Sequence, residues 1–134
     1  MKKLLFLLAL VAVAKLGYGQ TGTPTTQAEL AAFSWTTQVN DFGKIKQGTP
    51  VSHEFKFTNT GKVPLVITNV QASCGCTTPD WSKDPIPLGQ KGFIKATFSA
   101  AAAGVFDKSV TVMANVENGT VILKIKGEVV PNVP

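Results

Sequence analysis

The sequence lacks several features that would place it in a common functional class. None of its 13 basic residues is an arginine, the residue that makes bidentate contacts with phosphates and bases. It has no glycine-rich phosphate loop and no Cys-x-x-Cys pair beside a βαβ pattern. Its longest apolar run, residues 4–14, is shorter than the roughly 20 residues that cross a bilayer. We therefore expect no nucleic-acid partner, no nucleotide or thioredoxin-like chemistry, and no transmembrane segment.

The N-terminal 19 residues have the layout of a secretory signal peptide. Lys2 and Lys3 precede the apolar run, and Gly17 and Gly19 supply small residues at the cleavage site. We predict cleavage after Gly19 and a secreted or periplasmic protein. No cysteine lies at the cleavage site, so the lipid-attachment pattern of a lipoprotein is missing. Cleavage removes three lysines and leaves ten against eight acidic residues, so the mature chain is close to neutral.

The length of the remaining chain predicts a single domain. Residues 20–32 begin with a polar, threonine-rich stretch that is typical of a flexible leader. We assign residues 33–130 to the domain and residues 131–134 to a short tail.

Within the domain, apolar residues recur at every second position, which indicates half-buried strands. Asn118-Gly119 lies between two alternating runs and predicts a hairpin. Pro79, Pro85 and Pro87 should keep residues 77–88 out of a regular ladder, because proline has no N–H to donate. The predicted strands are residues 33–39, 51–58, 64–70, 93–99, 108–114 and 120–129, with a short edge piece near residues 42–45.

This pattern predicts an all-β fold, an immunoglobulin-like β-sandwich of about seven antiparallel strands. The antibody-type pair of distant cysteines is absent, so apolar packing alone must hold the core. The candidate core residues are Phe33, Phe55, Phe57, Phe93 or Ile94, Phe98, Leu123 and Ile125.

Cys74 and Cys76 are the only cysteines, and the segment Ser73-Cys74-Gly75-Cys76-Thr77 is the one place where chemistry is suggested. Three interpretations remain open. The cysteines could form a disulfide, which requires a sharp bend at Gly75 because residues two apart in a strand are too far apart to bridge. They could be soft ligands for copper or zinc, or they could be buried and inert.

His53, the only histidine, lies on the apolar face of its strand beside Phe55. It is a candidate third metal ligand with Cys74 and Cys76. A simple hairpin would pair His53 with Asn69 and keep it far from the cysteines, whereas a crossing between sheets could bring them together. Trp81 is expected to pack over the cysteine loop, and its alternative role is to bind a sugar or peptide as an exposed aromatic. No set of residues has the spacing of a catalytic site, so we expect no enzyme activity and no cofactor, with copper as the alternative.

Several segments together resemble family 1573 of the domains of unknown function. They are Asp41-Phe42-Gly43-Lys44-Ile45, residues 53–61, Pro64-Leu65-Val66-Ile67 and the Ser-Cys-Gly-Cys-Thr string. The resemblance implies a secreted bacterial protein, of a kind frequent in Bacteroidetes, with a Hydin-like or major-sperm-protein-like immunoglobulin fold. It also implies that a histidine is common at the position of His53. It implies no activity.

Two functions are consistent with these features. The first is a non-catalytic binding or assembly module of the bacterial cell envelope, whose partner is a protein or an envelope component. The second is a periplasmic thiol site at Cys74 and Cys76, either copper-binding or a redox-active disulfide.

Overall fold

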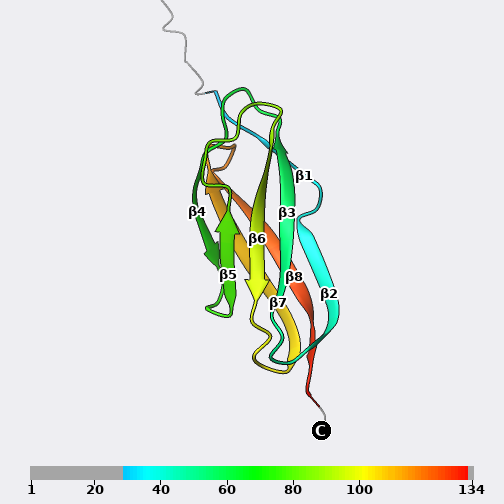
Figure 1. Ribbon diagram of the computed structural model, residues 1–134. Helices are drawn as coiled ribbons and strands as arrows, with labels where there is room; N and C mark the ends of the chain where they lie inside the picture. Colours follow the sequence, from blue (N-terminus) through cyan, green and yellow to red (C-terminus); the bar gives the residue numbers. More distant parts are fainter. Residues whose placement is uncertain (1–28, 133–134) are drawn as a thin grey trace, which may run out of the picture.

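The computed structural model describes residues 29–132, which form two four-stranded sheets packed face to face (Figure 1). One sheet has the order β1-β3-β6-β5 and the other β2-β8-β7-β4. The predicted immunoglobulin-like sandwich is confirmed, with eight strands. The predicted signal peptide lies outside the described residues. The strands are β1 (Phe33–Trp35), β2 (Val39–Lys46), β3 (Val51–Asn59), β4 (Ile67–Ala72), β5 (Thr77–Trp81), β6 (Lys91–Phe98), β7 (Gly104–Ala114) and β8 (Thr120–Val130).

The core lies between the two sheets and is built by the predicted alternation. Phe55 and Phe57 of β3 face inward opposite Leu123 and Ile125 of β8, and all four are buried. Phe33 packs only at the margin of this core. Of the two candidate core residues in β6, Phe93 and Ile94, it is Ile94 that is fully buried. Burial of large apolar side chains on both inner faces is what holds the two sheets together.

The strand β5 contradicts the prediction that prolines keep residues 77–88 out of a ladder. Pro79 lies opposite Ala96 in the antiparallel pairing of β5 with β6. The Ser99 N–H donates to the Cys76 carbonyl at the start of this pairing. Backbone groups alternate in direction along such a strand, so the nitrogen of Pro79 faces the free edge. The missing N–H therefore costs no bond to β6, and an edge strand accommodates the proline.

The predicted strand at residues 33–39 is divided between the two sheets. The chain pairs with β3 as β1, crosses at residues 36–38, and joins the other sheet as β2 (Figure 1). The pairing of β2 with β8 is parallel, so the strands of the sandwich are mostly, but not all, antiparallel. A short strand followed by a sheet change is invisible to a two-residue periodicity, since the alternation continues through the crossing.

The packed domain also begins earlier than the predicted boundary at residue 33. Ala31 is buried, and its N–H donates to the Asn115 carbonyl at 3.0 Å. The Ala32 N–H donates to the side-chain Oδ1 of Asn59 at 3.4 Å. The last residues of the expected flexible leader thus form part of the sandwich. Across residues 29–132, no helix has the length and apolar character needed to cross a membrane.

Candidate functional site

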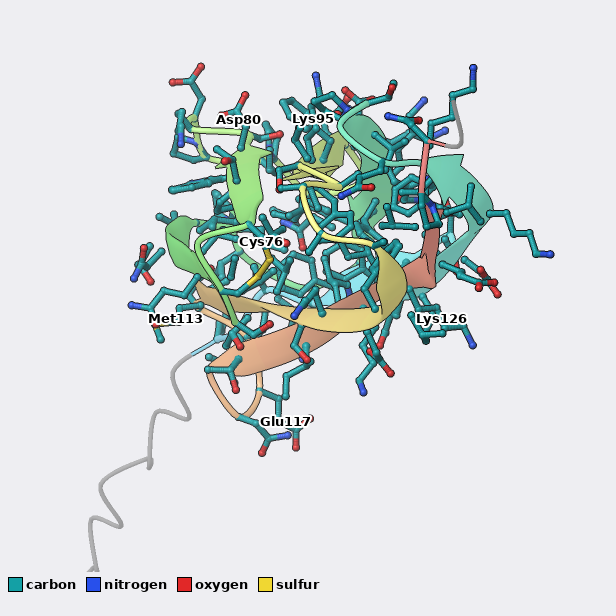
Figure 2. All side chains as sticks on the ribbon, turned by 90° about the horizontal axis from the view of Figure 1, so that it is seen from below. Cys76, Asp80, Lys95, Met113, Glu117 and Lys126 are labelled. Atoms are coloured by element: carbon teal, nitrogen blue, oxygen red, sulfur yellow. A yellow bond between two sulfur atoms is a disulfide. The ribbon has the colours of Figure 1, made fainter. Side chains whose placement is uncertain are left out.

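The two cysteines lie in the connection between β4 and β5, at the lower end of the sandwich in Figure 1. This connection crosses from one sheet to the other, and Figure 2 shows Cys76 at the crossing, seen from below. Ser73 is held to β7, because its N–H donates to the Ser109 carbonyl and its Oγ accepts from the Ser109 N–H. The Cys76 carbonyl accepts from the Ser99 N–H that follows β6. Each end of the loop is therefore fixed to a different sheet.

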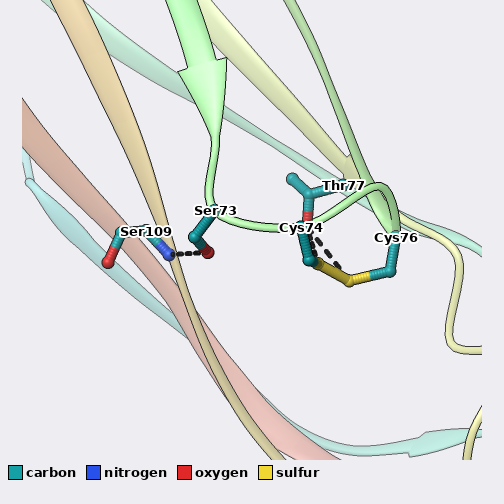
Figure 3. The surroundings of a disulfide bond; sticks show 5 residues. All are labelled: Ser73, Cys74, Cys76, Thr77 and Ser109. Atoms are coloured by element: carbon teal, nitrogen blue, oxygen red, sulfur yellow. Dashed lines mark hydrogen bonds between the residues drawn. A yellow bond between two sulfur atoms is a disulfide. The ribbon is translucent and has the colours of Figure 1, made fainter.

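Cys74 and Cys76 are brought together as a close pair and joined by a disulfide, with a Cα–Cα distance of 5.3 Å. The required bend is closed by the Thr77 N–H, which donates to the Cys74 carbonyl at 3.3 Å. The hydroxyl of Thr77 lies 3.9 Å from each sulfur (Figure 3). Both cysteines are half-buried, whereas Gly75 is exposed, and a side chain added there would meet open space. The disulfide between Cys74 and Cys76 is thus contacted by Thr77 on the protein side, and the loop is open to solvent at Gly75.

His53 is not brought together with the cysteines. The chain crosses between sheets after β3, so His53 pairs with Ala96 of β6 and not with Asn69. Among residues 29–132, no three histidine, cysteine or acidic side chains are grouped closely enough to hold a metal ion. The alternative of a copper site with Cys74, Cys76 and His53 as its three ligands therefore has no assembled ligand set in the part of the chain that the structure describes.

The environment of His53 is that of a core residue at the margin of the sandwich. Its ring packs edge-on against Phe55, with 4.7 Å between the ring centroids. Its Nε2 atom is shielded from solvent and has no hydrogen-bond partner among the described residues. Burial lowers the pKa of His53 below its ordinary value of 6.5, and the negative charge of Glu54 partly opposes this shift. The neutral imidazole is the favoured form in the folded protein.

Trp81 does not pack over the cysteine loop, contrary to expectation. It lies at the far end of β5, opposite Ile94, and packs against the core. The ammonium group of Lys83 lies 3.0 Å from the centroid of its ring. This cation covers the ring face on which a sugar or peptide would stack, so Trp81 has little free aromatic surface to offer.

A groove of about 760 Å³ at the upper end was missed by the sequence analysis. Its wall on one side is β1, where Phe33 and Trp35 stack with 4.6 Å between their ring centroids. Its opposite wall is the β7–β8 hairpin together with the first residues of β8. The Nε1 atom of Trp35 is buried and has no hydrogen-bond partner among residues 29–132. The apolar lining residues are Leu30, Ala31, Ala32, Phe33, Trp35, Val116 and Val121.

The groove runs beside a part of β8 that no other strand covers. Because β2 pairs with β8 only from Lys124 onward, residues 120–123 pair with β7 alone. The Lys124 N–H donates to the Gln38 carbonyl. Backbone groups alternate in direction along an antiparallel strand, so the N–H and C=O of Ile122 face the same, uncovered side. The groove thus has a partly apolar lining and adjoins a short free strand edge.

The other edges of the two sheets are protected against pairing with a further strand. The strand β1 has only three residues. The strand β2 carries Lys44 and Lys46 and an irregular register. A register shift between Ile67 and Asn69 interrupts β4, and Pro79 interrupts β5. The lower half of β3 is also uncovered, but exposed charged side chains at 54 and 56 flank it.

A protein-family model described as "Protein of unknown function (DUF1573)" matches residues 33–129, well over half of the chain. The chain belongs to the DUF1573 family. The resemblance based on the cysteine string and the segments before it is confirmed. Among curated proteins, none matches this DUF1573 chain.

Solved structures similar to this DUF1573 domain share its fold at low sequence identity. A protein of unknown function from Porphyromonas gingivalis W83 is 16% identical with a TM-score of 0.63, covering 75% of this chain and 47% of that one. The VesB protease of Vibrio cholerae is 17% identical with a TM-score of 0.61, covering 72% and 31%. The ASH or PapD-like domain 7 of human CEP192 is 9% identical with a TM-score of 0.59, covering 78% and 89%.

The first two of these proteins are much longer than the matched region, since the DUF1573 chain spans about half of one and about a third of the other. At such identities the likeness shows the fold alone. The family match and the structural relatives therefore show a DUF1573 domain with an immunoglobulin-like β-sandwich fold.

Proposed function

We propose that this protein is a secreted, non-catalytic module of the bacterial cell envelope that binds an extended segment of another protein in the groove between β1 and β8. The signal-like N-terminus and the family resemblance support the location. The groove supports the binding role. Within the described residues, no cluster of titratable side chains lines it in the manner of a catalytic site.

The observation that carries the proposal is the free edge of β8 beside a partly apolar groove, whose lining includes Thr120 and Val121 of the same strand. An extended peptide can add to such an edge through main-chain hydrogen bonds, while alternate side chains enter the adjacent pocket. The N–H and C=O of Ile122 provide the main-chain partners. The indole N–H of Trp35 is a buried donor without an acceptor, and a peptide carbonyl in the groove would supply one. Because the other edges are protected, the groove is the favoured place for an added strand.

The same features favour a protein segment over other envelope components. A polysaccharide would stack on exposed aromatic faces, but the rings of Phe33 and Trp35 stack on each other, and Phe57 packs edge-on against both. The charged residues at its rim, Glu29, Lys62 and Glu117, are of both signs. No strong field of one sign is present to select an ionic polymer.

The two tryptophans make a direct test possible. A mature chain of residues 20–134, labelled with nitrogen-15, would be titrated with an array of synthetic peptides that alternate apolar and polar residues. Binding in the groove should shift the indole N–H signal of Trp35 and protect the Ile122 amide from exchange. The indole signal of Trp81 should not shift, because Trp81 lies at the end of β5, on the opposite edge of the sheet from β1.

Matched substitutions separate the groove from the rest of the domain. Trp35→Phe keeps an aromatic ring but removes the donor, and should weaken peptide binding by about fivefold, the effect of one neutral hydrogen bond. Trp81→Phe should leave binding unchanged. Absence of binding by every alternating peptide, or equal effects of the two substitutions, would contradict the proposal.

A further inference from the structure

The cysteine loop contains a buried hydroxyl group that a simple cross-link does not require. The side chain of Thr77 is 4% exposed, and its Oγ1 lies 3.9 Å from both sulfurs (Figure 3). Among residues 29–132 this hydroxyl has no other hydrogen-bond partner. A buried hydroxyl is costly unless it is hydrogen-bonded, and sulfur in a disulfide is only a weak acceptor. A thiolate in the same position would be a far better partner for Thr77.

The backbone of the loop holds the two cysteines in place whether or not they are bonded. Ser73 is bonded twice to Ser109 of β7, and the Cys76 carbonyl is bonded to the Ser99 N–H. The Cα atoms are 5.3 Å apart, a separation set by these anchors and by the turn between them. After reduction the thiols would remain close together, so the pair could be oxidised again without refolding the chain.

The solvent side of the loop is open to an attacking thiol. Gly75 lies between the cysteines without a side chain, and nothing lies within 4 Å of where its Cβ would be. Thiol–disulfide exchange needs access to one sulfur along the direction of the bond that breaks. Both cysteines are partly exposed, with the open space at Gly75 between them, whereas Thr77 lies against both sulfurs.

We propose that Cys74 and Cys76 form a redox-active pair that oxidises dithiols, with the Thr77 hydroxyl as hydrogen-bond donor to the departing sulfur. One thiolate of the dithiol attacks a sulfur of the pair, the bond between Cys74 and Cys76 breaks, and the other cysteine leaves as a thiolate. In the mixed disulfide, the second thiolate of the dithiol then attacks the dithiol's own first sulfur. The bond to the cysteine breaks, and this cysteine also leaves as a thiolate. The dithiol becomes a cyclic disulfide, and its two electrons and two protons pass to Cys74 and Cys76. This site lies at the opposite end of the domain from the groove, and it does not depend on peptide binding there.

The test follows the reduction of the mature chain, residues 20–134, by dithiothreitol under native conditions. Free thiols are trapped by alkylation and counted by mass spectrometry, while circular dichroism follows the fold. The pair should be reduced at a rate proportional to the dithiothreitol concentration, the fold should persist, and oxidised dithiothreitol should restore the bond. Reduction at a rate independent of dithiothreitol would mean that unfolding must come first, and would overturn the proposal.

Substitutions at Thr77 test the role of the hydroxyl. Thr77→Val removes the donor and should slow reduction about tenfold, since a hydrogen bond to a charged group is worth at least that factor. Thr77→Ser keeps the donor and should react within about twofold of the unchanged protein. A residue that only supports the loop would behave in the opposite way, because loosening the loop exposes the sulfurs and speeds their reduction. Equal or faster reduction of Thr77→Val would therefore refute the assignment to Thr77.

Discussion

Replacing Asn59 with alanine should destabilise the domain strongly. Asn59 is 1% exposed and ends β3. Its Oδ1 accepts from the N–H groups of Gly61 at 3.0 Å and Ala32 at 3.4 Å. Its Nδ2 donates to the carbonyls of Val63 at 2.9 Å and Ile86 at 3.0 Å. One side chain thus joins the N-terminal segment to two loops at the upper end, where the groove is formed.

The expected loss follows from these four bonds. A hydrogen bond contributes about 1 kcal/mol net, and a buried group left without a partner costs about 1–3 kcal/mol. Because the bond to Ala32 is long, we expect a total loss of about 3–4 kcal/mol for Asn59→Ala. That is a large part of the roughly 5–15 kcal/mol by which a domain is stable. It corresponds to a fall in Tm of about 12 °C or more for a domain of this size.

The measurement is urea unfolding of the mature chain followed by tryptophan fluorescence. Asn115→Ala is the matched control, because the Asn115 side chain also makes two backbone bonds, to Val66 at 2.7 Å and to Pro64 at 2.9 Å, but both are exposed. Water can replace them, so this variant should lose about 1 kcal/mol or less. Equal losses for the two variants, or a loss below about 1 kcal/mol for Asn59→Ala, would refute the reasoning.

Three further predictions concern the loops and His53. Replacing both Cys74 and Cys76 with serine should lower the free energy of unfolding by only about 1.6 kcal/mol, because the disulfide closes a very short loop. If urea unfolding shows that this free energy falls by more than about 3 kcal/mol, the disulfide holds the fold together. Gly61→Ala should cost about 1–3 kcal/mol, because the added carbon would collide with the backbone of the N-terminal segment. The same change at Gly75 meets open space and should alter stability by less than about 0.5 kcal/mol. Because the pKa of His53 is lowered in the folded protein, the contribution of His53 to stability is complete above pH 6.5 and declines as the pH falls below that value. His53→Gln should abolish this decline. A decline that persists in the variant would have another origin.

The sequence predicts those parts of the fold that depend on local pattern. The alternation in β8 correctly predicts the burial of Leu123 and Ile125. The hairpin at Asn118-Gly119 is confirmed, and both residues adopt positive φ angles, of 65° and 74°. Turn chemistry and a two-residue period are properties of neighbouring residues, so they can be read without knowledge of the tertiary structure.

The parts that were missed depend on contacts between distant segments. Pro79 excludes a strand only if its nitrogen faces a neighbouring strand, and the pattern does not say on which side β6 lies. Asn59 reads as an ordinary turn residue, because its burial depends on the N-terminal segment and on the loop before β6. The groove depends on where the chain leaves β1 for the other sheet, which leaves part of β8 uncovered. Trp35 was therefore not recognised as a candidate, although its alternation with Phe33 was visible.

The uncovered edge of β8 is the basis of the proposed binding site, and amide hydrogen exchange of the mature chain tests it most directly. The Lys124 N–H is bonded to the Gln38 carbonyl and should exchange slowly. The Ile122 N–H, two residues earlier on the same side of the same strand, should exchange rapidly in the free protein and slowly once a peptide is bound. Slow exchange at both positions in the free protein would show that β8 is already covered, and would contradict the proposed binding site.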